Sequence, residues 1–237
     1  MLEKMFSKFF IVGHRGAAGL EPENTLRAIR RALDMGLRAV EIDVRMSKDG
    51  FPVVIHDDRV DRTTNGSGKV SDLTLEELRR LDAGMGEKIP LLDEVLDEIS
   101  NKAVLFLEIK EDGAVKPSVE SVISKDLLDS VLFISFSPNH LIKVKSIVGD
   151  AYTGLIYFKP SDGIIQAKKI DAIAVLPYFR FATAKAINFA HRLKLKMIAW
   201  TVNDPNIAEK LYRNGVDGIT TDRPDILLKL GETGGRL

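Results

Sequence analysis

The sequence predicts a (β/α)8 barrel, a closed ring of parallel strands surrounded by helices. Short apolar runs alternate with longer amphipathic runs along most of the chain. Eight such strand–helix units fit into 237 residues, which suits a single domain over residues 1–237 better than two small ones. Polar side chains recur where the apolar runs end, and barrel enzymes carry their active sites there. An open doubly wound sheet is the alternative, although it usually has fewer strands.

The overall composition limits which kinds of molecule the protein is expected to bind. Lys plus Arg and Asp plus Glu each number 34, so no net charge attracts nucleic acid or an anionic membrane. The absence of cysteine excludes disulfides, thiolate zinc sites and cysteine nucleophiles. The apolar run at 9–12 is too short for a signal peptide, and no segment reaches membrane-spanning length. We therefore expect a cytoplasmic protein that acts on a small molecule, without stable membrane insertion. Its oligomeric state is left open.

The first predicted strand, 9–13, leads into a motif of glycines and cations. Gly13 and Gly16 bracket a histidine and an arginine, so the backbone can turn sharply there and approach a ligand closely. Arg15 offers a planar donor fork that matches phosphate oxygens. An ordinary turn with a surface arginine is the plainer interpretation of the same residues.

A helix is predicted next, over 25–35. Its apolar residues share one face, Asn24 or Thr25 serves as the cap, and Gly36 ends it. A plain cap is the simpler interpretation of Asn24. The following strand completes a βαβ unit.

Residues 39–58 carry the densest group of chemically active side chains. Glu41 and Asp43 alternate with β-branched residues on one strand, so both project from the same face. Two such carboxylates repel each other unless a cation lies between them. A turn at 47–50 leads to a second short strand, and this hairpin arm would return His56 to the level of Glu41.

The rest of the chain continues the alternation. A polar loop at 61–68 precedes a helix at 72–81, which a Thr74–Glu77 capping box begins. The strand at 103–110 ends with a carboxylate and an amine, Glu108 and Lys110, on one face, which fits either a ligand site or a simple ion pair. The other predicted strands are 131–136, 151–158, 172–177, 196–202 and 218–221, and the other predicted helices are 91–99, 138–148, 161–169, 183–193 and 205–214.

Taken in order, these motifs resemble the glycerophosphodiester phosphodiesterase family. The matching elements are His14-Arg15-Gly16, Pro22-Glu23-Asn24-Thr25, Glu41-Ile42-Asp43, His56-Asp57, Glu108-Ile109-Lys110, Trp200-Thr201-Val202-Asn203 and Gly215-Val216-Asp217-Gly218 to Asp222-Arg223-Pro224. The resemblance covers about residues 10 to 227. It implies a TIM barrel and metal-dependent hydrolysis of phosphodiesters such as glycerophosphocholine or glycerophosphoethanolamine.

The resemblance also implies roles for individual residues. By position it implies metal ligands at Glu41, Asp43 and Glu108, an acid/base pair at His14 and His56, and phosphate contacts at Arg15 and Lys110. All-oxygen ligation favours one hard cation, Mg²⁺ or Ca²⁺, over zinc. Trp200 is a candidate substrate contact, although an aromatic residue on a barrel strand more often belongs to the core. His140 and His191 lie in helical patterns and are interpreted as surface or packing residues.

Several alternatives stay open from sequence. The nucleophile is either water or the neighbouring glycerol 2-hydroxyl, which would give a cyclic phosphate first. Either histidine can be the acid. A lysophospholipase D acting on lipid-like diesters, and a non-catalytic barrel that binds phosphorylated ligands, are the rival functions.

Overall fold

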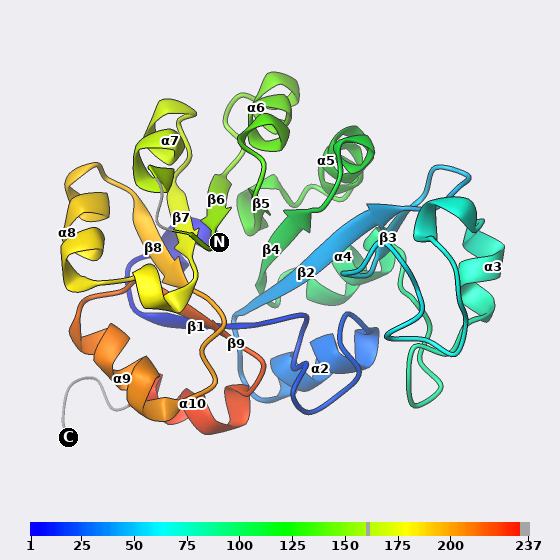
Figure 1. The fold of residues 1–237 in the computed structure, drawn as a ribbon, viewed down its shortest axis with the longest axis horizontal. Coiled ribbons are helices and arrows are strands. Elements are labelled where there is room, and N and C mark those ends of the chain that lie inside the picture. The colour runs from blue at the N-terminus through cyan, green and yellow to red at the C-terminus, as the bar shows by residue number, and fades with distance from the viewer. Residues whose placement is uncertain (160–161, 233–237) are drawn as a thin grey trace.

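The computed structural model describes residues 1–159 and 162–232 and folds them into a barrel (Figure 1). Strands follow the order β1-β9-β8-β7-β6-β5-β4-β2-β3, and a further pairing of β1 with β2 closes a parallel ring. Among the described strands, β3 alone lies outside the ring, antiparallel to β2. The strands are β1 (Phe10–Gly13), β2 (Ala39–Met46), β3 (Pro52–Val54), β4 (Val104–Ile109), β5 (Val131–Ser135), β6 (Thr153–Tyr157), β7 (Ala174–Pro177), β8 (Lys196–Ala199) and β9 (Gly218–Thr221). The closed ring confirms the predicted barrel over the open sheet.

Helices surround the ring, as Figure 1 shows. They are α1 (Leu2–Met5), α2 (Leu26–Asp34), α3 (Leu75–Arg80), α4 (Leu92–Ile99), α5 (Val115–Ser124), α6 (Pro138–Ile147), α7 (Gly163–Lys169), α8 (Ala184–Arg192), α9 (Pro205–Arg213) and α10 (Pro224–Glu232). Short 3₁₀ turns are η1 (Val70–Asp72), η2 (Asp112–Ala114), η3 (Leu128–Ser130) and η4 (Phe179–Phe181).

Strand alternation sorts the apolar side chains into two cores. In β4, Leu105 and Leu107 pack outward against the helices, whereas Phe106 packs inward within the ring. Leu2 of α1 is fully buried in the inner core. The ammonium of Lys196, the first residue of β8, donates to the carbonyl of Phe6 at 2.9 Å. Helix α1 therefore closes the end of the barrel where the strands begin.

The predicted hairpin arm is present. Val44 of β2 pairs with Val54 of β3, and the Ile55 N–H donates to the Asp43 carbonyl at 3.0 Å. After β3 the chain leaves the ring, and the apolar side chains of this segment form a small separate core. That core consists of Val53, Ile55, Val60, Val70, Leu78, Ala83 and Ile89.

Other boundaries differ modestly from the predictions. The helix predicted at 72–81 divides into η1 and α3, although the Thr74–Glu77 capping box is present. Residue 161, the predicted start of α7, lies outside the described residues. Helix α5 was not predicted at all. It contains Pro117, which the first helical turn tolerates because its backbone nitrogens have no partner there.

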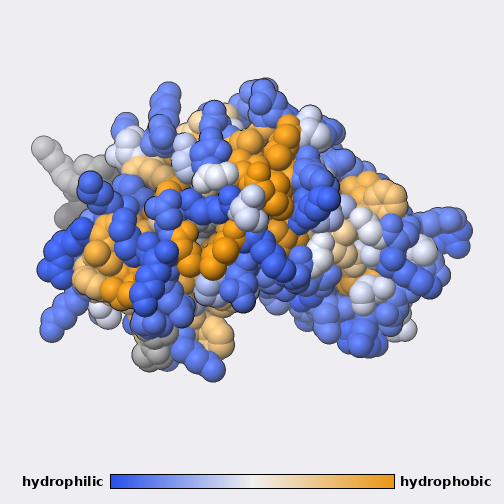
Figure 2. Space-filling view, turned by 90° about the horizontal axis from the view of Figure 1, so that it is seen from above, coloured by the Kyte–Doolittle hydropathy of each residue, from blue (hydrophilic) through white to orange (hydrophobic). Residues whose placement is uncertain are grey.

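Figure 2 shows the side of the molecule that lies at the top of Figure 1, where apolar side chains gather within a mostly polar surface. Exposed apolar side chains on helices α5 to α7 are Ile123, Ile142, Ile147 and Ile165. Among the described helices, none combines the length and hydropathy needed to cross a bilayer.

Candidate active site

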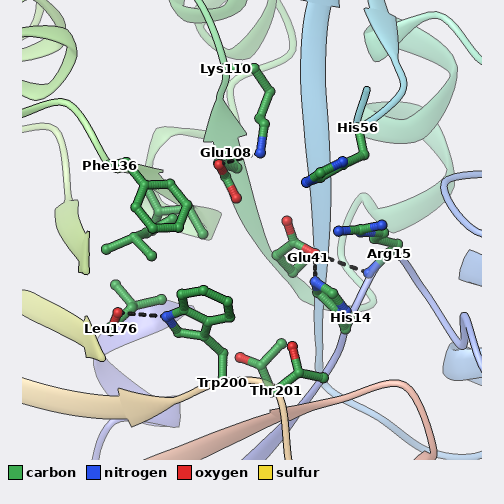
Figure 3. Close-up of a pocket in the computed structure, with 13 residues that line it drawn as sticks. His14, Arg15, Glu41, His56, Glu108, Lys110, Phe136, Leu176, Trp200 and Thr201 are labelled. Carbon is green, nitrogen blue, oxygen red and sulfur yellow. Dashed lines mark hydrogen bonds and ion pairs between the residues drawn. The ribbon is translucent and has the colours of Figure 1, made fainter. Parts of the chain in front are cut away.

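A cavity of about 220 Å³ opens where the strands of the barrel end (Figure 3). One wall is polar and the other apolar, and Figure 3 shows them facing each other. Its lining consists of His14, Arg15, Glu41, His56, Glu108, Lys110, Ile134, Phe136, Ile156, Leu176, Trp200, Thr201 and Thr220. The structure therefore brings together all predicted site residues except Asp43 around one cavity. Asp43 lies beneath them, in contact with Arg15 and Lys110.

The loop after β1 is shaped by its two glycines. A Cβ on Gly13 would stand 2.3 Å from the Gly16 carbonyl oxygen, and one on Gly16 would stand 2.5 Å from the Ala28 backbone. These glycines therefore allow the loop to pack closely against neighbouring backbone, whereas the sequence suggested a close approach to a ligand. The resulting turn holds Arg15 at a φ of 49° and lets its N–H donate to Glu41 Oε2 at 3.0 Å.

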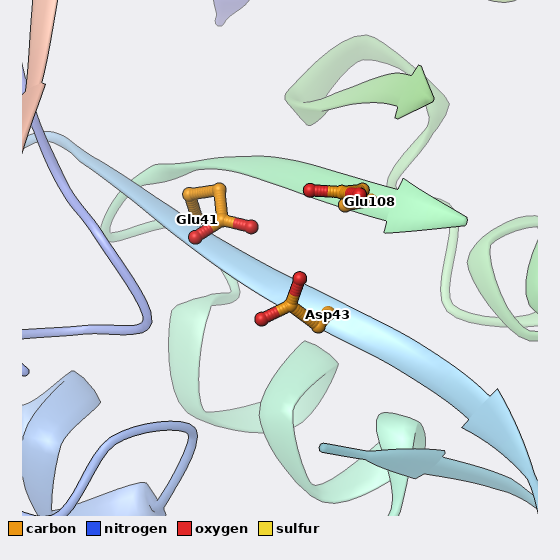
Figure 4. A group of neighbouring side chains, drawn as sticks. All are labelled: Glu41, Asp43 and Glu108. Atoms are coloured by element: carbon orange, nitrogen blue, oxygen red, sulfur yellow. The ribbon is translucent and has the colours of Figure 1, made fainter. Parts of the chain in front are cut away.

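Three carboxylates converge below the cavity (Figure 4). Glu41, Asp43 and Glu108 each place one oxygen within 4.8 Å of the others, and all three are buried. Parallel register brings this about, because Asp43 of β2 lies directly beside Glu108 of β4. Glu41 Oε1 is buried without a hydrogen-bond partner, and Asp43 Oδ1 is buried with only the Lys110 ammonium nearby, at 3.3 Å. Buried oxygens of this kind normally have a partner, so the arrangement fits a bound cation.

The charges of the three carboxylates also fit a bound cation. Burial, reinforced by repulsion from Asp43, raises the pKa of Glu108 to about 7. Burial and the charges of Asp43 and Glu108 raise the pKa of Glu41 well above its usual value. Burial also opposes the ionisation of Asp43, but Lys110 and Arg15 outweigh it and lower the Asp43 pKa to about 2. With all three carboxylates ionised, as ligation of a metal requires, their negative charge exceeds the positive charge of Lys110 and Arg15. An all-oxygen donor set of this kind can hold a hard divalent ion.

Lys110 and Arg15 flank the carboxylates. The Lys110 ammonium lies 2.6 Å from Glu108 Oε1 and 3.3 Å from Asp43 Oδ1. Arg15 Nε lies 3.2 Å from Asp43 Oδ2, and its Nη1 donates to Glu23 at 2.7 Å. The simple ion pair considered for Glu108 and Lys110 therefore exists, within the wall of the cavity.

Each predicted catalytic histidine is held by a carboxylate. His14 Nδ1 lies 2.6 Å from Asp222 Oδ1, and His56 Nδ1 lies 2.6 Å from Asp57 Oδ1. Ionised carboxylates only accept hydrogen bonds, so both Nδ1 atoms carry the proton and leave Nε2 for other partners. His14 Nε2 lies 3.8 Å from Glu41. Burial lowers the pKa of His56, against the opposing effect of Asp43.

The residues that orient the histidines and carboxylates were not assigned from the sequence. Asp222, which was named there only as part of a matching motif, holds His14, and its second oxygen accepts from Asn203 Nδ2 at 2.7 Å. Thr25 is the cap of α2, because its side chain accepts from the Ala28 N–H. Asn24 instead donates to Asp43 Oδ2 at 2.8 Å and accepts from the Asp43 N–H. The position of Asp222 and Asn24 within the matching motifs was the one sequence feature that could have pointed to these roles.

Trp200 belongs to the apolar wall. Its Nε1–H donates to the Leu176 carbonyl at 2.7 Å, and its ring meets Phe136 edge to face at 5.6 Å between centroids. With that donor occupied, the indole offers a ligand only its apolar surface. His140 and His191 lie outside the cavity and bind Ser135 and Asp217 respectively.

Comparison with known proteins shows the family of this chain. The model of the glycerophosphoryl diester phosphodiesterase family matches residues 14–226. A glycerophosphodiester phosphodiesterase from Caldanaerobacter subterraneus subsp. tengcongensis is 36% identical, over 96% of this chain and 100% of the relative. Another from Bacillus altitudinis is 32% identical, over 94% and 98%. The structure of an Oleispira antarctica phosphodiesterase in complex with the product sn-glycerol-3-phosphate superposes with a TM-score of 0.85 at 31% identity, covering 93% of this chain and 95% of that one. The chain belongs to the glycerophosphoryl diester phosphodiesterase family and is an enzyme of that class.

Proposed function

We propose that this enzyme hydrolyses glycerophosphodiesters such as glycerophosphocholine or glycerophosphoethanolamine to glycerol 3-phosphate and an alcohol. The observation that carries the proposal is one cavity in which two carboxylate-held imidazoles adjoin a buried carboxylate trio. The product bound by the Oleispira antarctica relative supports the product class. We further propose that the reaction depends on a divalent cation, either Mg²⁺ or Ca²⁺.

Charge is the first obstacle to the reaction. A phosphodiester is an anion, and its oxygens repel an incoming nucleophile. The proposed ligands Glu41, Asp43 and Glu108 would hold the cation, which supplies neutralisation of the phosphoryl oxygens and polarisation of phosphorus. Arg15 and Lys110 add charge-assisted hydrogen bonds that strengthen as charge builds on those oxygens.

Proton transfer is the second obstacle. The Nε2 atoms of His14 and His56 are the free ends of two oriented imidazoles, so one can accept a proton from the nucleophile while the other donates one to the leaving alkoxide. The carboxylates keep a proton on each Nδ1, so Nε2 is the atom that takes up a proton in the base and gives one up in the acid. The attacking oxygen is that of water or of the adjacent glycerol hydroxyl, which are distinguished by trapping a cyclic phosphate.

A release assay tests the proposal. Glycerophosphocholine, glycerophosphoethanolamine and a nucleic-acid dinucleotide are incubated with protein stripped by EDTA and then supplied with Mg²⁺, Ca²⁺ or nothing. We expect glycerol 3-phosphate from the first two substrates only, and only with a cation. Full turnover by the stripped protein would contradict the metal-dependent proposal.

The apolar wall favours a second candidate substrate, a lysolipid. Ile134, Ile156 and Leu176 line the cavity beside Trp200. Phe136 contacts the more exposed Phe158. A long acyl chain could bury apolar surface there, whereas a small polar alcohol gains little from it. Higher kcat/KM on lysophosphatidylcholine than on glycerophosphocholine would favour lysophospholipase D activity. A purely ligand-binding barrel is set aside, because the chain belongs to an enzyme family and every predicted acid, base and ligand residue is present.

A further inference from the structure

We infer that Arg62 is a positioning residue for this reaction, because its guanidinium ties the carboxylate that holds His56 to the carboxylate that holds Arg15. The inference rests on the proposed roles of His56 and Arg15. Arg62 lies in the polar loop at 61–68, and no role was assigned to it from sequence.

The first half of the tie reaches the histidine. Arg62 Nε donates to Asp57 Oδ2 at 2.6 Å, and Nη2 donates to Asp57 Oδ1 at 3.1 Å. Asp57 Oδ1 is also the oxygen that lies 2.6 Å from His56 Nδ1. The hydrogen bonds from Arg62 keep the pKa of Asp57 far below its usual value. Asp57 therefore stays a pure acceptor and holds the proton of His56 on Nδ1.

The second half of the tie reaches the phosphate-binding arginine. Arg62 Nη1 donates to Glu23 Oε2 at 2.8 Å, and Nη2 donates to Glu23 Oε1 at 2.7 Å. Glu23 Oε1 also accepts from Arg15 Nη1 at 2.7 Å. One nitrogen, Arg62 Nη2, thus bridges the two oxygens on which His56 and Arg15 depend.

This bridge joins parts of the chain that fold against different cores. Glu23 precedes α2 and belongs to the barrel, whereas Asp57 and Arg62 follow β3 in the segment that has its own small core. Without the bridge, the orientation of the His56 imidazole relative to the Arg15 guanidinium would depend only on how the segment after β3 packs against the barrel. Within the part of the chain that the structure describes, His14 has no equivalent tie to an arginine, because the second oxygen of Asp222 accepts from the neutral amide of Asn203.

The planar fork is essential to this role. Arg62 makes four hydrogen bonds from three nitrogens, a pattern that a lysine ammonium cannot reproduce. The side chain is 48% exposed, and exposed ion pairs contribute little to stability. We therefore expect its removal to change orientation and rate more than folding.

Arg59 provides a matched control. It lies three positions away in the same segment, its side chain is 50% exposed, and its ion pair is with Asp61, outside the tie. Arg59→Gln should leave kcat/KM unchanged. Arg62→Gln should lower kcat/KM by about 10- to 100-fold, the usual effect of losing a residue that orients a site residue through hydrogen bonds. Arg62→Lys, which keeps the charge but not the fork, should stay impaired. Full rescue by lysine would overturn the role of the fork.

A spectroscopic measurement separates positioning from damage to the fold. In ¹⁵N-histidine spectra of the metal-free protein, His56 should be the Nδ1–H tautomer in wild type and a tautomer mixture in Arg62→Gln. His14 should be unchanged, and the His56→Ala variant assigns the signals. A double-mutant cycle adds a second readout, because Glu23→Gln should cost much less in the Arg62→Gln background than in wild type. If Arg62→Gln fails to fold, the same measurements of kcat/KM and of the His56 tautomer are made on Glu23→Gln and Arg62→Lys.

The outcomes distinguish this inference from the function on which it depends. Full activity of His56→Ala would overturn the proposed mechanism and this inference with it. An impaired His56→Ala, beside an Arg62→Gln variant with wild-type kcat/KM and an unchanged His56 spectrum, would overturn the inference alone.

Discussion

Glu108 gives the sharpest prediction about the metal, because its charge is destabilising when no cation is bound. Its pKa rises from 4.5 to about 7 on folding, through burial first and Asp43 second. At ~1.4 kcal/mol per pKa unit, that difference corresponds to about 3 kcal/mol. A raised carboxyl pKa penalises the folded state only where the group is ionised. The penalty is therefore absent below pH 4.5, grows up to about pH 7 and is constant above it.

Glu108→Gln keeps the shape of the side chain and removes its charge. In EDTA at pH 8, we expect the variant to be more stable than wild type by up to about 3 kcal/mol. The advantage should shrink steadily as the pH falls towards 5. Urea unfolding of both proteins at pH 8, 7, 6 and 5 measures the difference in unfolding free energy.

Added cation should reverse the order. Wild type at 1,000 times the dissociation constant gains about 4.1 kcal/mol by mass action, which exceeds the advantage of the variant. Glu108→Gln has lost a proposed ligand and should gain little. Most of its activity should also be lost. A variant less stable than wild type in EDTA at pH 8, or an advantage that does not change with pH, would refute the reasoning.

Three further predictions concern the remaining site residues. Glu41→Gln and Asp43→Asn should each lose most activity on glycerophosphocholine while circular dichroism shows an intact fold, so substantial turnover by either would count against its role as a ligand. Arg15→Lys should reduce kcat/KM by roughly tenfold or more, about 1.4 kcal/mol, and an unchanged value would place Arg15 outside the phosphate site. His14→Ala and His56→Ala should each lose on the order of 10²- to 10⁴-fold in kcat, and wild-type kcat/KM should follow a bell-shaped pH profile whose limbs belong to the pair. A nitrophenyl phosphodiester needs no general acid and should rescue only the variant that lacks the acid, so identical responses of both would contradict the two-histidine mechanism.

The parts of the molecule that local periodicity determines were predictable from sequence. Alternation along β2 placed Glu41 and Asp43 on one face, and the hairpin turn returned His56 beside them. Contacts between distant loops were not predictable in this way. His14 and Asp222 are 208 residues apart and meet because β1 and β9 are neighbours in the closed ring. Arg62 and Glu23 are 39 residues apart and meet only when the segment after β3 packs beside the barrel. The single-domain organisation and the cytoplasmic location stay predictions.

Helix α1 covers the end of the barrel that lies opposite the site. Leu2 shares the inner core with Phe106, and Phe106 lies two residues before Glu108 on β4. The carboxylates therefore lie above an apolar interior whose opposite end α1 covers. In such a low dielectric, the charges of Arg15 and Lys110 act more strongly than they would in water. We expect a chain without residues 1–8 to let solvent into that apolar interior and so to weaken the field, although no residue at the mouth had changed.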